Sequence, residues 1–268
     1  MCNIACGENY IKDWINFDYS PNSKYVRKAD LLKPLPVADS FADLVYSSNF
    51  IEHIPRNLVR SFLNECFRII KSGGYLRLVL PDWEELCSTY LTLRRSDEQQ
   101  QKRADFLMLE MLDQCVRTIS GGELGAYYQR LQAKPSEYDE LIEFVQHLTG
   151  HKLRTVDDTV PPKALHRSPF KRILSKLEQQ YIRAVISLLP SAFRHQNISW
   201  TQIGEKHAWM YDFYTIGCLL SKAGFVDVQR MSATTSNISD FPFMPLDVNP
   251  DGSPRKGAES MYIEAVKP

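Results

Sequence analysis

Gly7 and Asp18 are the first residues whose types and spacing suggest chemistry. Gly7 follows the short apolar run 2–6, and Asp18 ends the mainly apolar stretch 14–17. A glycine after a strand lets the backbone approach a ligand closely, and a helix beginning there favours negative groups. In nucleotide-binding α/β sheets, an acid at the end of the second strand accepts hydrogen bonds from ribose hydroxyls. The pair therefore indicates a nucleotide-type cofactor pocket, with the alternative that both residues only form turns.

The elements that must position this pair alternate between strands and a helix. Apolar runs predict strands at residues 2–6, 14–17, 25–29, 43–48 and 75–80. Apolar residues recur at helical spacing from Leu58 to Ile70, after Pro55 and before a Gly-Gly pair that should close the helix. Alternation of this kind is typical of a mainly parallel sheet with helices on its faces.

The pattern changes after residue 82. Strand signals vanish, and helices are expected over residues 83–95, 99–119, 137–148 and 170–188. This block is too long for an ordinary connection, so it predicts a helical insertion that covers the site, comprising residues 83–203. The earlier pattern then resumes with a helix over 207–223, a strand over 225–229, a polar loop over 232–258 and a last strand over 261–266. Residues 1–82 and 204–268 together should form the sheet domain.

The order of short motifs along the chain resembles a known family. The motifs are Gly7, Asp18, Ala29-Asp30-Leu31, Leu35-Pro36, the run 41–45, Glu52-His53-Ile54, the run 71–74 and Pro81-Asp82. In this order they look like a class I S-adenosylmethionine-dependent methyltransferase, most similar to the type 11 methyltransferase-domain group. The later stretches 204–212, 223–225 and 260–265 resemble the subset associated with bacterial glycan and polysaccharide biosynthesis.

The resemblance implies a fold, a cofactor and a set of binding residues. The fold is a Rossmann-like α/β sheet with a large helical insertion between the fifth and sixth strands, and the cofactor is S-adenosyl-L-methionine. Residues 5–7 would form the loop under the methionine part, Asp18 would bind the ribose hydroxyls, residues 30–31 would hold the adenine, and residues 47–49 would border the sulfonium. The predicted cofactor-binding residues are therefore Ala5, Cys6, Gly7, Asp18, Asp30, Leu31, Ser47, Ser48 and Asn49.

Two histidines are candidates for assisting methyl transfer. Transfer from a sulfonium is an in-line displacement, and a hydroxyl acceptor benefits from a general base. His207 is the first candidate, and on the expected helix it would share a face with Tyr211. His53, just after the fourth strand, is the second. The alternatives are that His53 braces the helix after Pro55 and that His207 only packs. The resemblance favours O-methylation of a glycan or small-molecule acceptor.

Composition limits the partners and the location. A formal net charge of +0 disfavours nucleic acid as a partner. No apolar run approaches the ~20 residues of a membrane span, and the lack of a signal-peptide pattern favours the cytoplasm. The basic and apolar segment 171–194 suits either a peripheral membrane contact or packing within the insertion.

No metal site is predicted. The 6 cysteines include no CxxC pair, so neither a zinc ribbon nor a disulfide framework is expected. His147 and His151 have the spacing of two ligands on one helix, but Gly150 lies between them and no third ligand is evident.

Two other function classes stay open on the sequence alone. A non-catalytic methyltransferase-like binding protein is compatible with the single glycine that replaces the full GxGxxG pattern. A nicotinamide-dependent oxidoreductase shares the order of strand, glycine and acid, although the second and third glycines are absent. The acceptor and the oligomeric state are not determined by these patterns.

Overall fold

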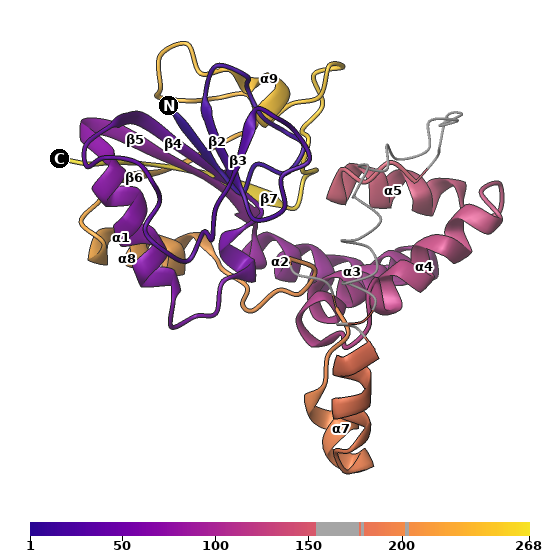
Figure 1. Ribbon diagram of the computed structural model, residues 1–268. Helices are drawn as coiled ribbons and strands as arrows, with labels where there is room; N and C mark the ends of the chain where they lie inside the picture. Colours follow the sequence, from indigo (N-terminus) through magenta and orange to yellow (C-terminus); the bar gives the residue numbers. More distant parts are fainter. Residues whose placement is uncertain (154–176, 178–179, 202–203) are drawn as a thin grey trace.

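A mixed seven-stranded sheet forms the centre of the protein, for which a computed structural model describes residues 1–153, 177, 180–201 and 204–268 (Figure 1). The strand order is β3-β2-β1-β4-β5-β7-β6. The strands are β1 (Cys2–Ile4), β2 (Ile15–Asp18), β3 (Val26–Lys28), β4 (Ala42–Ser48), β5 (Ile70–Pro81), β6 (Val226–Met231) and β7 (Ser260–Val266). Strands β1 to β5 pair in parallel, and β7 runs antiparallel to both neighbours. The predicted α/β class, including a helical insertion between β5 and β6, is confirmed.

Apolar side chains on both faces hold the sheet in place. Helices α1 (Val59–Ile69) and α8 (Phe213–Lys222) cover one face, where α1 buries Phe62, Leu63 and Cys66. The other face is covered by residues 232–258, which include the short helix α9 (Phe243–Leu246). Figure 1 shows α1 and α8 on one side of the sheet and α9 on the opposite side.

The connection between β1 and β2 contains no helix within residues 5–14, all of which the structure describes. No helix N-terminus therefore follows Gly7 within these described residues to favour a negative group. Parallel strands are usually joined by a crossover of a dozen or more residues, and this connection is too short for one. The buried Asn16 side chain shapes it instead, donating hydrogen bonds to the carbonyls of Ile11 (2.8 Å) and Trp14 (2.9 Å).

The boundaries of two predicted helices differ from those observed. Helix α1 ends at Ile69, and strand β5 begins at once, so the Gly73-Gly74 pair lies inside a strand. The helix expected from residue 207 begins only at Phe213, because the Asp212 carboxylate accepts a hydrogen bond from the Thr215 N–H (2.6 Å) and caps the helix there. His207 and Tyr211 are therefore not on a helix.

The insertion is helical, as predicted, but it contains more helices than the sequence indicates. The described elements are α2 (Trp83–Arg94), α3 (Glu98–Val116), α4 (Gly122–Ala133), α5 (Asp139–Thr149) and α7 (Ser191–Asn197). Helix α4 was not predicted, because it begins at Gly122, the second residue of a glycine pair that is typical of a loop. The short α7, which follows Pro190, was not predicted either. The insertion has its own apolar core, in which Phe106, Leu107 and Val145 are fully buried.

The predicted helix 170–188 lies only partly within the described residues. Residues 180–187 are helical, and Tyr181, Val185 and Leu188 are exposed rather than packed against the insertion. The remainder of this prediction falls outside the described residues. Within the described ranges, no helix has the length and apolar character needed to cross a membrane.

Helix α5 attaches the insertion to the segment that precedes β7. The N–H groups of Ala258 and Glu259 donate to the carbonyls of His147 and Leu148, both at 3.0 Å. Gly257 permits this approach, since it has φ +67° and a side chain there would overlap the Leu148 carbonyl oxygen. The same segment continues to the carboxyl edge of the sheet, so this contact helps to fix the position of the residues at that edge.

Candidate functional site

A cleft of about 180 Å³ lies at the carboxyl ends of β1 and β4, where ligands bind in open α/β sheets. The two strands pair in parallel, so the loops that follow them meet at one edge. Predicted cofactor residues that line the cleft are Ala5, Cys6, Gly7, Ser48 and Asn49. Others around it are Asn3, Glu8, Asn9, Tyr46, Leu246, Arg255 and Lys256.

Gly7 and Asp18 are in direct contact. The Gly7 N–H donates to Asp18 Oδ2 (2.9 Å), and the Ser20 N–H donates to Oδ1 (2.8 Å). Each carboxylate oxygen keeps further acceptor capacity for a hydroxyl. Gly7 has φ +52°, and no described atom lies within 4 Å of the position a Cβ would take. The Asp18 carboxylate and the open loop at Gly7 are therefore adjacent. This arrangement is the one needed to bind a ribose together with the chain attached to it.

Four predicted cofactor residues do not line the cleft: Asp18, which is beside it through its contact with Gly7, and the three described next. Asp30 is exposed and forms an ion pair with Lys33 (3.2 Å), and the hydrogen bond from Lys33 lowers the pKa of Asp30. Leu31 is buried in the main apolar core. Ser47 is buried within β4, and its hydroxyl has no partner among the described residues. Their predicted roles stay predictions.

Arg255 and Lys256 line the cleft but were not predicted. They come from the polar loop 232–258, where nothing in the sequence separates them from other exposed charges. Burial lowers the pKa of Lys256. The Arg255 Nε is buried and makes no hydrogen bond to any described residue. The cleft therefore carries two cationic side chains beside the glycine loop.

Cys6 is expected to react slowly with alkylating reagents, although it lines the cleft. Burial, reinforced by the Asp18 charge, raises the pKa of Cys6 to about 12. At pH 8 the thiolate fraction is then on the order of a thousandfold below that of an ordinary cysteine. Peptide mapping after iodoacetamide treatment should show Cys6 unmodified in the native protein and modified in denaturant. The less buried Cys218 serves as the internal reference, and equal native labelling of both thiols would contradict the assignment.

A second group of polar side chains lies just beyond the end of β4. Glu52 and His53 lie on the short 3-10 helix η1 (Ile51–His53), and His207 is on the irregular segment 204–212. The rings of His53 and His207 are 4.8 Å apart between centroids, at 75°. The structure thus brings the two predicted catalytic residues into contact, and it adds Glu52, which was not predicted.

Burial favours the uncharged forms of all three side chains. It raises the pKa of Glu52 to about 7 and lowers the pKa of His207 to about 3, with the neighbouring His53 adding to the latter. Burial also lowers the pKa of His53. Both imidazoles are therefore neutral near pH 7, with lone pairs available. A histidine with so low a pKa is a weak base, so His207 is a poorer sole proton acceptor than the sequence suggests.

Lys256 connects this group to the cleft. It lines the cleft, and its charge acts on both Glu52 and His53. Glu259, buried nearby, has its pKa raised by burial, and its Oε2 has no described partner. We call Glu52, His53, His207, Lys256 and Glu259 the buried polar cluster.

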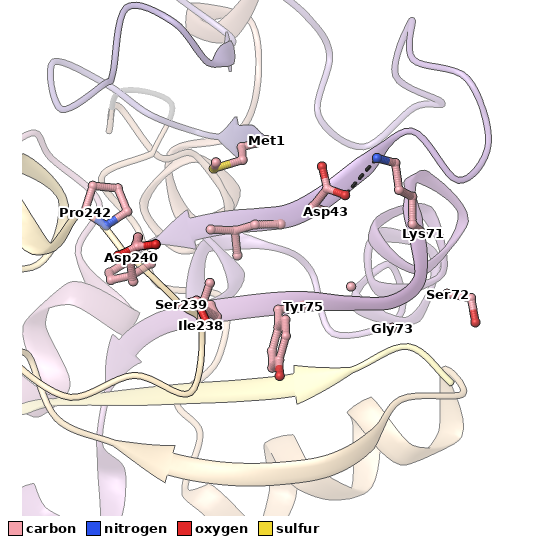
Figure 2. Close-up of a pocket in the computed structure, with 13 residues that line it drawn as sticks. Met1, Asp43, Lys71, Ser72, Gly73, Tyr75, Ile238, Ser239, Asp240 and Pro242 are labelled. Atoms are coloured by element: carbon pink, nitrogen blue, oxygen red, sulfur yellow. Dashed lines mark hydrogen bonds and ion pairs between the residues drawn. The ribbon is translucent and has the colours of Figure 1, made fainter.

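A larger cavity, of about 320 Å³, lies away from this chemistry. It is formed by the start of β4, by β5 and by the loop residues 238–242 (Figure 2). Figure 2 shows the Asp43–Lys71 ion pair (2.7 Å) at one end. Because it includes the amino end of β4 rather than its carboxyl end, it is not where a parallel sheet binds a nucleotide.

One protein family matches part of the chain, and several solved structures are similar to it. Residues 7–78 match the family described as "Methyltransferase domain". Similar solved structures include an S-adenosylmethionine-dependent methyltransferase from Thermotoga maritima, a possible histamine N-methyltransferase (15% identity, 100% of this chain and 81% of that chain, TM-score 0.39). Another comes from Archaeoglobus fulgidus (15% identity, 99% and 85% covered, TM-score 0.39). No curated protein matches the chain.

Residues 7–78, which include β2 to β4 and most of β5, are therefore a methyltransferase domain. S-adenosylmethionine is the methyl donor of such a domain. This match replaces the nicotinamide-dependent alternative, whereas a non-catalytic methyltransferase-like protein would match the same domain. The narrower resemblance to the glycan-associated subset stays a prediction.

Proposed function

We propose that this methyltransferase transfers its methyl group to an oxygen of a glycan or another small polyhydroxylated acceptor. The observation that carries the proposal is the buried polar cluster beside the cleft. Glu52 and Glu259 have carboxylate oxygens without partners among the described residues, and carboxylates accept hydrogen bonds from hydroxyl groups. Such a cluster suits an acceptor rich in hydroxyls.

The residues around the cleft fit the cofactor in charge and in shape. Asp18 offers acceptors for two ribose hydroxyls, and the open backbone at Gly7 allows close approach. Arg255 and Lys256 offer positive charge for the carboxylate of the methionine part. The cleft is smaller than the ~300 Å³ or more of a full ligand pocket, so it suits the methionine part, with the ribose extending past Asp18. Asp30 and Leu31 stay the proposed adenine contacts.

The proposed reaction is a single displacement. The acceptor oxygen forms a bond to the methyl carbon while the carbon–sulfur bond breaks, and its electron pair stays on sulfur. The products are the methyl ether, S-adenosylhomocysteine and one released proton. We propose that His53 and His207 face the acceptor and assist the loss of that proton, while the protein supplies alignment of the reacting atoms. Cytoplasmic location is part of the same proposal.

The proposal is tested by methyl transfer from labelled S-adenosylmethionine to a panel of sugars and glycolipid headgroups, with primary amines as the comparison. Labelled methyl ether is expected on a hydroxylated acceptor, and His53→Gln should lower kcat by about 100-fold or more with little change in the KM for the donor. Asp18→Asn should instead raise the KM for the donor. Labelling confined to amines, or full activity in His53→Gln, would overturn the proposal.

A further inference from the structure

We propose that Glu52, His53 and His207 bind one divalent transition-metal cation of the Zn²⁺ class. One ligand atom from each side chain can be chosen so that all three lie within 4.8 Å of one another. Two imidazoles with one carboxylate form a common donor set for zinc and for other first-row divalent cations. The binding of the cation does not depend on the proposed acceptor.

The burial of unsatisfied ligand atoms is the first argument. Glu52 is 1% exposed, and neither of its carboxylate oxygens has a partner within the part of the chain that the structure describes. His207 is 5% exposed, and its Nδ1 likewise has no described partner. Buried polar atoms are almost always paired, because leaving them unpaired costs free energy. A cation between them would satisfy all three atoms at once.

The orientation of His53 is the second argument. Its Nδ1 lies 3.0 Å from the Lys206 carbonyl oxygen, an acceptor that places the proton on Nδ1. The lone pair is then on Nε2, which lies 4.0 Å from Glu52 Oε1. A histidine that binds a metal through one nitrogen and donates its other N–H to a carbonyl is the usual arrangement around protein metal ions.

The backbone around the three side chains is held in place. The Glu52 carbonyl accepts hydrogen bonds from the N–H groups of Ala208 (2.7 Å) and Trp209 (3.1 Å). The His207 N–H donates to the Gln114 carbonyl (2.9 Å) on α3. The segment 204–212 is thereby fixed against η1, with the three ligand atoms within 4.8 Å of one another.

Nearby charges of both signs act on the site. The positive charges are Lys256 and Arg117, and Arg117 is paired with Asp113 (2.7 Å). The charge of Lys256 is opposed by Glu259, and Glu110 lies close enough to Glu259 to affect it. Asp113 therefore offsets the charge of Arg117, while Lys256 places one positive charge close to the site.

The place of the cation in the reaction rests on the proposed function. Asn49, which lines the cleft, precedes Glu52 in the same turn after β4. A cation there would contact the acceptor oxygen, and the two histidines would assist proton loss as ligands of that cation. This role would fail if the acceptor were not a hydroxyl, but cation binding would not.

The test uses the full chain, stripped with a chelator and titrated with Zn²⁺ alone in the absence of donor and acceptor. One equivalent should bind, and it should raise the melting temperature. His207→Ala and the conservative Glu52→Gln should each weaken binding by about 10-fold or more. His147→Ala, which removes an exposed histidine at the end of α5, should leave the affinity unchanged.

A second measurement needs no variant. Co²⁺ added to the wild-type protein should give the visible absorption of a cation bound by nitrogen and oxygen in a low-symmetry site. Failure of Zn²⁺ to bind, or equal affinity in wild type, His207→Ala and Glu52→Gln, would overturn the proposal. Because neither measurement involves methyl transfer, failure here is distinct from failure of the acceptor assignment.

Discussion

Replacement of Arg77 by methionine is expected to destabilise the protein by about 3–5 kcal/mol, because it leaves two buried carboxylates without their cation. Arg77, on β5, is fully buried and contacts Asp247 (2.7 Å) and Glu264 (2.6 Å). Its guanidinium also donates to the carbonyls of Ser232 (2.9 Å) and Thr235 (3.2 Å). The Arg77 side chain thus links residues 232–258 to the sheet through an ion pair and hydrogen bonds.

Denaturant unfolding of Arg77→Met measures this loss. Asp39→Ala is the matched control, since it removes the ion pair between Asp39 and Arg68 (2.5 Å), in which the Asp39 side chain is 77% exposed. Exposed ion pairs contribute about 0–1 kcal/mol. The segment held by Arg77 also carries Arg255 and Lys256, so donor affinity should fall as well. A loss of stability no greater than that of Asp39→Ala would show that the network does not hold the segment.

Gly257→Ala is expected to separate helix α5 from the segment before β7. An alanine side chain would overlap the Leu148 carbonyl oxygen, and the backbone at this position is left-handed, with φ +67°. Overpacking costs about 1–3 kcal/mol and the left-handed conformation about 1–2 kcal/mol for a residue with a Cβ. The change should lower both the melting temperature and the affinity for S-adenosylhomocysteine.

Gly252→Ala separates the two contributions to this effect. Gly252 lies in the same loop and has φ +81°, but no described atom is within 4 Å of its Cβ position. It should show only the cost of the left-handed backbone, with unchanged affinity for the cofactor product. Equal effects of the two substitutions would mean that the contact between α5 and residues 257–259 does not support the cleft.

The sheet could be predicted because its strands are short apolar runs separated by turn residues, and the pairing of Gly7 with Asp18 follows from their places at two neighbouring strand ends. Element boundaries were less accurate, since they depend on single contacts. The Asp212 cap makes α8 begin later than predicted. Strand β5 already begins at Ile70, which pairs with Ala42 of β4, so it continues through Gly73-Gly74. Helix α4 begins within a pair of glycines, so its start resembles a loop.

The site was only partly predictable for a different reason. Ala5 to Gly7, Ser48 and Asn49 follow strands, so their positions come from the topology of the sheet. Arg255 and Lys256 reach the cleft through a long loop, and Glu52 is significant only because tertiary packing buries it beside His207. No local pattern carries information of that kind.

The most direct test of the account is calorimetric titration of S-adenosylhomocysteine into the wild-type chain, Asp18→Asn and Asp13→Asn. Asp13 lies in the same β1–β2 connection but is exposed, so its substitution is the control. We predict micromolar binding that Asp18→Asn weakens by ten-fold or more, about 1.4 kcal/mol, and that Asp13→Asn leaves unchanged. Absence of binding by the folded protein, or equal affinity in all three chains, would contradict a cofactor site at Gly7 and Asp18.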